Sequence, residues 1–294
     1  MLLFKDSFLL LVTSPVYAVL IAAEMLLSHL QHRNYFSLKG TLANFYLAIV
    51  CVCLDVSMRT FWFAVLASVY AFHFIQVTDH YLYWPSLLIL QDLSFYFMHR
   101  VDHRCRFFWA VHVTHHSSEE FNLTVGFRPS VLQPLYRFAW FCPLAFLGYR
   151  PEDIMLMYSI TQIYGVLIHT KYVGKLGWLE LFLATPSHHR VHHGRNPQYL
   201  DKNLGMVFII WDRIFGTFAE EKEEVRYGLA GNAKGYGPIG LIFHEWQAVA
   251  RDLRKPVSLR ARLMYVFGPP GWQFESGQNS DCGNRSTRLP SEVE

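Results

Sequence analysis

The chain has 294 residues, of which 52% are apolar and only 17% are charged, with 24 Phe, 16 Tyr and 8 Trp. This apolar and aromatic content exceeds that of ordinary globular proteins, whereas the mean hydropathy of +0.16 is lower than a fully membranous transporter would have. We therefore expect several membrane spans together with a sizeable water-facing part. The net charge of +3 is too small to indicate nucleic-acid binding, and no basic run with interleaved aromatic residues occurs.

Two apolar stretches open the chain. Residues 8–27 have about the ~20 apolar residues that cross a bilayer core. They lack the charged start and the small-residue cleavage site of a secretory signal, so we expect a retained membrane helix. The second stretch, 41–77, is too long for one span and is interrupted by Asp55 and Arg59. It predicts two crossings or a hairpin.

Further apolar stretches follow at 84–98, 131–148 and 152–169, and each predicts one more span. The last two are separated by Gly-Tyr-Arg-Pro, which indicates a tight turn between antiparallel helices. A shorter apolar element at 203–218 contains two charges and is expected to pack on the membrane surface or on the metal-binding part. Residues 238–267 form an amphipathic stretch.

Histidine is the unusual residue of this chain, because eight of the fifteen histidines fall in three short clusters. The clusters have the spacings HxxxH, HxxHH and HxxHH. On an α-helix, positions i, i+3 and i+4 share one face with Cβ atoms about 5–6 Å apart, so each cluster can direct two or three imidazoles at one point. Eight imidazoles are too many for one ion, and the pattern predicts two adjacent metal ions. The predicted ligands and catalytic residues are His99, His103, His112, His115, His116, His189, His192 and His193.

The ligand type restricts which metals the site can bind and which reactions it can support. Imidazole suits zinc, copper, iron and nickel. No cysteine lies in a cluster, which disfavours structural zinc, and catalytic zinc usually takes three protein ligands. A histidine-rich pair of irons beside lipid fits oxygen activation better. Two alternatives stay open, a zinc-dependent lipid hydrolase and a metal-binding membrane transporter, although a transporter would need more ionisable groups along its spans.

Three further residues are candidates for the same site. His169 ends the apolar stretch 152–169 and is a candidate ninth ligand, and His188 adjoins the third cluster. Asp92 precedes His99 by seven residues, which places it on the same helical face inside an apolar span. It is therefore a candidate for holding the outer N–H of a ligating imidazole, or for capping some other buried donor.

The order of the spans and clusters predicts the topology. The pair of spans at 131–148 and 152–169 leaves one membrane face and returns to it, so all three histidine clusters lie on one side. The positive-inside rule makes that side cytoplasmic, because the opposite turn carries only Arg150. The basic residues on the metal side are Arg100, Arg104, Arg106, Arg128, Lys171, Lys175, Arg190, Arg195, Lys202 and Arg213.

With these motifs in place, the chain resembles the fatty acid hydroxylase and sterol desaturase family from about residue 84 to about residue 272. Segments 115–133, 185–203 and 209–221, together with FGPPGW at 267–272, are most similar to the alkylglycerol monooxygenase branch. The resemblance implies a non-haem di-iron centre, dioxygen as co-substrate, a lipid substrate and an external electron donor. That donor is a protein or, in this branch, a tetrahydropterin. Arg104 stands where the branch has a glutamate associated with pterin use, so the donor stays open.

The sequence therefore predicts an all-α protein, a multi-span membrane helical bundle with a cytoplasmic histidine-rich metal domain. We expect N-terminal membrane helices in 1–83, a catalytic domain in 84–272 and a disordered tail in 273–294. The expected function is dioxygen-dependent oxidation of a lipid C–H bond, either hydroxylation or desaturation, and the substrate stays open between an ether lipid and a sterol or fatty-acyl lipid.

Overall fold

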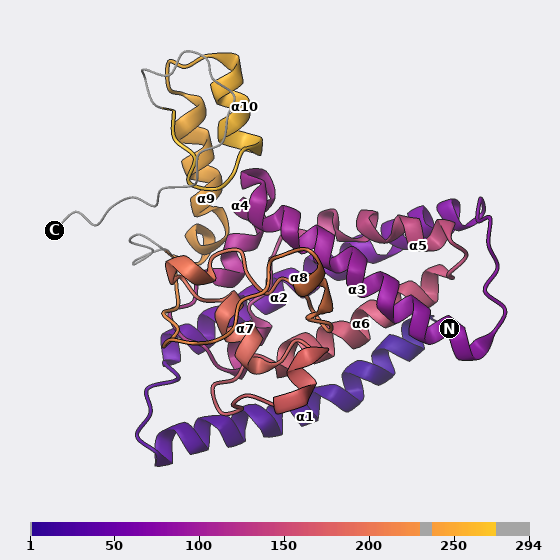
Figure 1. Cartoon of the computed structure of the whole chain (residues 1–294), viewed down its shortest axis with the longest axis horizontal. Coiled ribbons are helices and arrows are strands. Elements are labelled where there is room, and N and C mark those ends of the chain that lie inside the picture. Colours follow the sequence, from indigo (N-terminus) through magenta and orange to yellow (C-terminus); the bar gives the residue numbers. More distant parts are fainter. Residues whose placement is uncertain (1, 230–236, 275–294) are drawn as a thin grey trace.

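The computed structural model describes residues 2–229 and 237–274. Within these ranges the regular elements are helices, apart from one isolated β-bridge between Leu183 and Phe208 (Figure 1). The all-α prediction is therefore confirmed. The α-helices are α1 (Leu2–Leu30), α2 (Leu38–Tyr70), α3 (His80–Arg104), α4 (Arg106–His116), α5 (Cys142–Phe146), α6 (Pro151–Leu167), α7 (Pro186–His192), α8 (Ile210–Ile214), α9 (Pro238–Leu253) and α10 (Leu259–Phe267). The short 3-10 helices are η1 (Leu123–Phe127), η2 (Gln133–Leu135), η3 (Arg137–Phe141), η4 (Gly177–Leu181) and η5 (Pro197–Tyr199).

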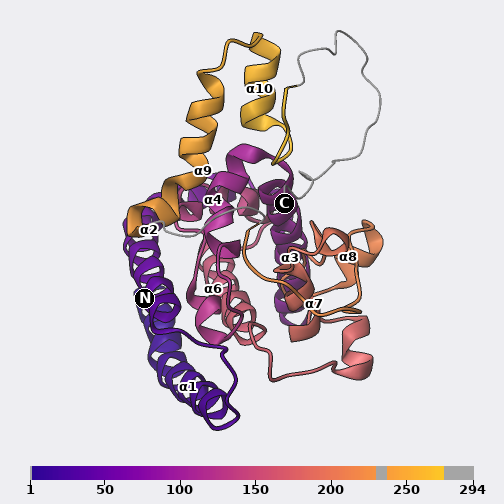
Figure 2. The same ribbon diagram turned by 90° about the vertical axis from the view of Figure 1, so that its left-hand side faces the viewer.

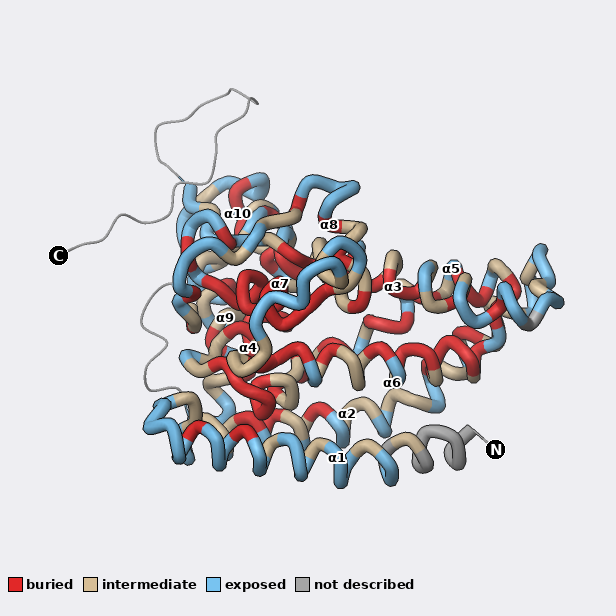
Figure 3. The backbone as a smooth tube through the Cα atoms, turned by 60° about the horizontal axis from the view of Figure 1, so that its bottom comes forward, coloured by how far each residue is buried: buried red, intermediate tan, exposed pale blue. Residues whose placement is uncertain are grey.

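Two helices of the described chain are long and apolar enough to cross a membrane. They are Leu11–Leu30 within α1 and the whole of α2, and only 11% and 17% of their most apolar windows are buried in the protein. From Leu11 to Leu30, the surface of α1 is mostly exposed (Figure 3). Exposed apolar helices of this kind are expected where lipid replaces water as the surrounding medium.

The expectation of two crossings or a hairpin in 41–77 is wrong, because α2 is a single helix of 33 residues. Its start is fixed by Ser37, whose side chain accepts a hydrogen bond from the backbone N–H of Gly40 at 3.0 Å. Asp55, one of the two charges that suggested a break, forms an ion pair with Arg137. A neutralised carboxylate can stay inside a continuous helix.

The expected span at 131–148 is also wrong, because the chain there forms η2, η3 and the five-residue α5. Pro134 and Pro143 each stand near the start of a short helix, where the missing N–H costs nothing. In the middle of a longer helix the same prolines would remove a hydrogen bond and clash with the preceding turn. The expected span at 152–169 corresponds to α6, which has 17 residues.

The main apolar core lies between α2, α3, η3, α5 and α6, where Trp62, Leu87, Phe141 and Tyr158 are buried together. Its packing positions α3, whose C-terminal end carries the first histidine cluster. At Cys105 the backbone leaves the helical conformation, with φ −113° and ψ 118°, and α4 then packs back against α3. This break brings the HxxxH and the first HxxHH motif to the same place.

The C-terminal helices α9 and α10 pack on α4 and on each other. They project from the rest of the protein at a steep angle to α1 (Figures 1 and 2). The buried guanidinium of Arg106, at the start of α4, bonds to Glu245 at 2.7 Å and to Asp252 at 2.6 Å, both on α9. From residue 275 onward, the tail that the sequence predicts to be disordered lies outside the described residues.

Candidate metal centre

The three histidine motifs come from three helices that meet beside the main core. His99 and His103 lie on α3; His112, His115 and His116 lie on α4; His189 and His192 lie on α7, with His193 as its C-terminal cap. His169 follows the end of α6. The helix α7 begins at Pro186, directly after its N-cap residue Thr185. This start determines in which direction the helix presents its histidines.

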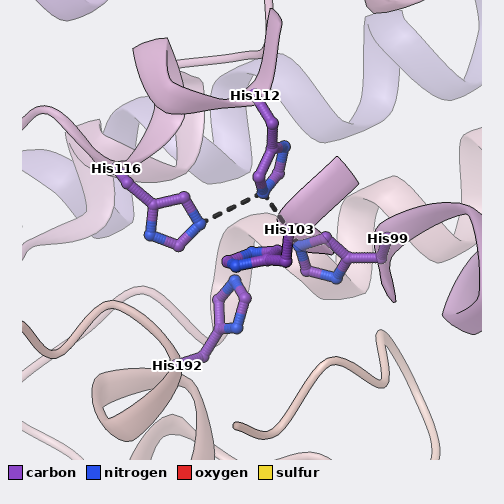
Figure 4. Close-up of side chains that lie close together, drawn as sticks. All are labelled: His99, His103, His112, His116 and His192. Atoms are coloured by element: carbon purple, nitrogen blue, oxygen red, sulfur yellow. Dashed lines mark hydrogen bonds between the residues drawn. The ribbon is translucent and has the colours of Figure 1, made fainter. Parts of the chain in front are cut away.

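Five of these imidazoles form what we call the five-histidine group, and their nearest nitrogens lie within 4.8 Å of one another. Nε2 of His112 is 2.9 Å from Nε2 of His99 and 3.1 Å from Nε2 of His116. The rings are directed at a common centre (Figure 4). The members are His99, His103, His112, His116 and His192, all of them buried.

The other four imidazoles form the four-histidine group, composed of His115, His169, His189 and His193. The Nε2 atoms of His169, His189 and His193 form a triangle with sides of 2.8, 3.2 and 3.2 Å. His169, which the sequence marks as a candidate ninth ligand, is therefore brought together with three residues of the motifs.

The two groups are neighbours. The ring of His116, in the five-histidine group, lies 4.6 Å from the ring of His193, in the four-histidine group, measured between centroids. Two further pairs cross between the groups, His115 with His116 and His192 with His193, and the ring centroids of each pair are 5.3 Å apart. Because α4 and α7 each contribute residues to both groups, a shift of either helix would disturb both.

The outer ring nitrogens of the groups are held by acceptors, several of which belong to the main chain. Nδ1 of His99 bonds to the carbonyl of Leu204 at 2.7 Å, and Nδ1 of His115 to that of Arg128 at 2.6 Å. Similar bonds orient His169 (Gly165 O, 2.7 Å), His192 (Lys202 O, 3.1 Å) and His112 (Ser130 Oγ, 2.7 Å). An imidazole that donates Nδ1–H outward turns the Nε2 lone pair inward, which is the usual arrangement of metal-ligating histidines.

This donor set fits a cation at the centre of each group. The Nε2 atoms of His103 and His192 are buried and make no hydrogen bond, although a buried polar atom is normally paired. The Nε2 atoms that face one another at about 3 Å carry lone pairs whose repulsion only a shared proton or a metal ion relieves. The grouped residues are histidines only, so the site is rich in neutral nitrogen ligands.

Burial lowers the pKa values of imidazoles in both groups. It lowers the pKa of His115 to about 4 and holds the pKa values of His116 and His189 well below the usual 6.5, with the neighbouring histidines adding to the effect. Taking a charged imidazolium out of water is unfavourable, and two of them at these distances repel each other. Neutral imidazole is the form that binds a metal.

Two candidates from the sequence lie elsewhere. His188 is outside both groups, and its Nδ1 accepts a hydrogen bond from the backbone N–H of Thr185 at 3.3 Å, which caps α7. Asp92 holds no imidazole: its carboxylate accepts from the N–H groups of Val207 and Phe208 and from Nε1 of Trp211, each at 2.9 Å. The alternative reading of Asp92, a carboxylate that caps other buried donors, is the one that the structure supports.

Sequence reasoning missed the acceptors that orient the rings. Ser130 and Asp201 contact His112 and His103, at 2.7 Å and 3.3 Å, but neither has a spacing that points to the clusters. The carbonyl acceptors have no side-chain signal at all. A polar residue shortly after a motif, such as Ser130, is the only trace that a sequence could offer.

Comparison with known proteins identifies the region that carries the site. Residues 84–217, which include all nine grouped histidines, match the model of the family described as fatty acid hydroxylase. Residues 84–217 belong to the fatty acid hydroxylase family. The resemblance expected from the histidine motifs is thereby confirmed.

The relatives of this fatty acid hydroxylase region act on lipids, as far as their names state. Alkylglycerol monooxygenase of Homo sapiens is 41% identical over 189 residues, which cover 64% of this chain and 42% of the relative. The enzyme of the same name from Danio rerio is 38% identical over 202 residues, covering 68% and 45%. An ornithine lipid hydroxylase of Rhizobium tropici is 28% identical over 163 residues, covering 52% and 49%. The chain thus spans less than half the length of these relatives, and no solved structure matches it.

Proposed function

We propose that this chain is a membrane-embedded enzyme that binds two irons through its nine grouped histidines and uses dioxygen to oxidise a C–H bond of a lipid. The observation that carries the proposal is the pair of adjacent groups of imidazoles, eight of the nine buried, whose Nε2 atoms converge while outer nitrogens are held by the main chain. A single ion would not use nine such ligands, and a zinc hydrolase would not need them.

The names of the relatives support a lipid substrate. Four curated relatives called alkylglycerol monooxygenase are 37–41% identical to this chain. We therefore propose an alkylglycerol, a glycerol lipid with an ether-linked chain, as the substrate, and hydroxylation of the carbon beside the ether oxygen as the reaction. The alkyl chain of such a lipid would approach from the bilayer.

The residues would divide the work as follows. The five-histidine group and the four-histidine group would each hold one iron, and the irons would supply the oxidising chemistry. In the overall reaction, one atom of dioxygen would enter the C–H bond. The other atom would leave as water, with two electrons and two protons from an external donor. The carbonyl and hydroxyl acceptors keep the rings in position. Rings of Phe95, Trp109 and Phe121 pack at 5.3–5.6 Å against His99, His103 and His169, and exclude water from the site.

We also propose that α1 and α2 cross the bilayer, that α3 and α6 lie within the same bundle, and that the histidine groups face the cytoplasm. The exposed apolar surfaces of α1 and α2 support the first part. The excess of lysine and arginine near the histidine groups supports the orientation. The catalytic unit would then extend from residue 84 to residue 272, behind the N-terminal membrane helices.

The proposal is tested by purifying the full chain without oxygen in detergent and measuring iron and zinc per chain. Dioxygen uptake is then followed with an alkylglycerol, and with either a tetrahydropterin or a reduced electron-transfer protein as donor. We expect two irons per chain and oxygen uptake that depends on the alkylglycerol. A sterol and an ester-linked glycerolipid serve as comparison substrates. Zinc alone, with no oxygen uptake after iron is restored, would overturn the proposal.

A further inference from the structure

The hairpin of α9 and α10 carries an exposed apolar surface that the histidine chemistry does not use. On α10, Leu259, Leu263 and Phe267 are spaced four residues apart, so they form one stripe of the helix, and 73%, 51% and 58% of their surfaces are exposed. On α9, Ile239 and Phe243 form a similar stripe.

The ring of Phe107, from α4, joins the two stripes. It lies 6.1 Å from the ring of Phe267 and 5.1 Å from the ring of Trp246 on α9. We call this set of exposed apolar side chains the α9–α10 ridge. It consists of Ile239, Phe243, Phe107, Phe267, Leu263 and Leu259, all exposed.

The charge around the ridge is positive. Among residues 237–274 the carboxylates are Glu245 and Asp252, and both are paired with the buried Arg106. The basic side chains of the hairpin are exposed, and they are Arg251, Arg254, Lys255, Arg260 and Arg262. An apolar stripe flanked by arginine and lysine is the pattern of helices that lie in the surface of an anionic bilayer.

The point at which the hairpin meets α2 agrees with a location of the hairpin at the membrane surface. In the connection after α2 and at the start of α3, Phe72, Phe74, Tyr81 and Trp84 are exposed. Aromatic side chains of this kind mark one bilayer interface. About 20 residues cross a bilayer core, so counting back from Tyr70 places the opposite interface near residue 50. This leaves the N-terminal part of α2, from residue 38, beyond the core.

The hairpin leaves the protein at that second interface. Ile242 of α9 is buried against Leu47 of α2 and Val131. Leu47 lies about one helical turn beyond residue 50, where the opposite interface was placed. From there α9 and α10 run at a steep angle to α1 (Figures 1 and 2). A helix pair that starts at the interface and runs across the direction of the spanning helices lies along the membrane surface.

We propose that the α9–α10 ridge inserts into the boundary between headgroups and acyl chains of the bilayer that α1 and α2 cross, with its basic side chains among anionic headgroups. The inference requires α1 and α2 to span the membrane but does not depend on the oxidation chemistry. Because α4 packs directly on α9, the ridge places lipid beside the helix that carries His112, His115 and His116.

The test is site-specific photocrosslinking of the full chain in lipid nanodiscs. Benzoylphenylalanine replaces Leu263 or Phe243 in the ridge, or Gln198 as the control, an exposed polar residue of η5 that lies outside the hairpin. We expect lipid adducts, detected by mass spectrometry, at 263 and 243 at least five times more often than at 198. The adducts at 263 should increase when phosphatidylglycerol replaces part of the phosphatidylcholine.

Crosslinks from 263 or 243 to a second copy of the chain, or equal lipid labelling at 198, would overturn the proposal. Hydrogen exchange of α10 gives a second readout on the unsubstituted protein, since its amides should exchange more slowly in nanodiscs containing phosphatidylglycerol than in those without it. Equal exchange in both would also contradict it. Iron content measured on the same samples separates a failure of this inference from a failure of the proposed function.

Discussion

The carboxylate of Glu24, near the C-terminal end of α1, accepts a hydrogen bond of 2.5 Å from the hydroxyl of Thr170, the residue that follows His169. Its second oxygen accepts from the backbone N–H of Leu123 at 2.7 Å, and the side chain is only 5% exposed. The carbonyl of Thr170 in turn accepts a hydrogen bond of 3.0 Å from Arg190, which follows His189. One carboxylate in a candidate membrane helix thus connects α1 to the four-histidine group.

Replacing Glu24 by Ala should weaken metal binding at the four-histidine group. It leaves the Thr170 hydroxyl and the Leu123 N–H buried without their acceptor, which costs about 1–3 kcal/mol for each group. We expect a lower midpoint of thermal unfolding and less than two metal ions per chain. Thr13→Val is the control, because the Thr13 hydroxyl bonds only within α1, to the Leu9 carbonyl. Full metal content in Glu24→Ala would show that the connection does not position His169.

Replacing His192 by Ala should remove one of the two metal ions and reduce turnover by about 100-fold or more, since even residues that merely orient a ligand change affinity or activity by 10–100-fold. The matched control is His188→Gln, four positions earlier in α7. The amide oxygen can still accept from the Thr185 N–H, and His188 lies outside both groups. Metal analysis and oxygen uptake are measured on both variants. If His188→Gln loses metal as His192→Ala does, the assignment of ligands from the two groups is wrong.

Replacing Asp92 by Ala should loosen the segment 204–211, since three donors there lose their shared acceptor. That segment supplies the Leu204 carbonyl that orients His99. We expect metal affinity to fall by about 10-fold, together with a lower unfolding temperature. Asp79→Ala removes the N-terminal cap of α3 at its other end, and should cost about 1 kcal/mol of stability with unchanged metal affinity. Equal metal affinity in both variants would argue against this coupling.

The metal-free protein should lose stability in acid. Burial holds the pKa of His115 near 4, whereas in the unfolded chain it is near 6.5, so below pH 6.5 the unfolded state takes up protons that the folded state refuses. A difference of that size corresponds to roughly 3 kcal/mol for this one residue. The midpoint of thermal unfolding, measured between pH 7 and pH 4, should fall steadily. Bound metal should delay the fall, and a flat profile for the metal-free protein would contradict the expectation.

The histidine motifs were the most predictable part of the molecule. Spacings of three and four residues are local properties of a helix, so the grouping of His112 with His116 followed from the sequence before any tertiary contact was known. His169 was marked by its place at the end of an apolar helix. The division into groups of five and four was not predictable, because it depends on how α4 and α7 face each other.

The apolar stretches were less informative. Hydropathy at 131–148 does not distinguish a helix from a series of short turns packed inside the protein, and only the prolines indicated the difference. At 41–77 the error was the opposite one, because a break was predicted inside a continuous helix. The charge of Asp55 suggested the break, but its partner is Arg137, more than eighty residues away. A charge looks like an interruption until its tertiary partner is known.

The carbonyls that orient the rings belong to Leu204, Arg128, Gly165 and Lys202. A carbonyl is present whatever side chain is attached, so substitutions such as Lys202→Ala leave the acceptor in place. Alanine scanning would therefore overlook this half of the site, and related chains can diverge at these positions while the rings keep their orientation. What evolution must preserve there is the path of the backbone, and the identity of the residues along it is free to drift.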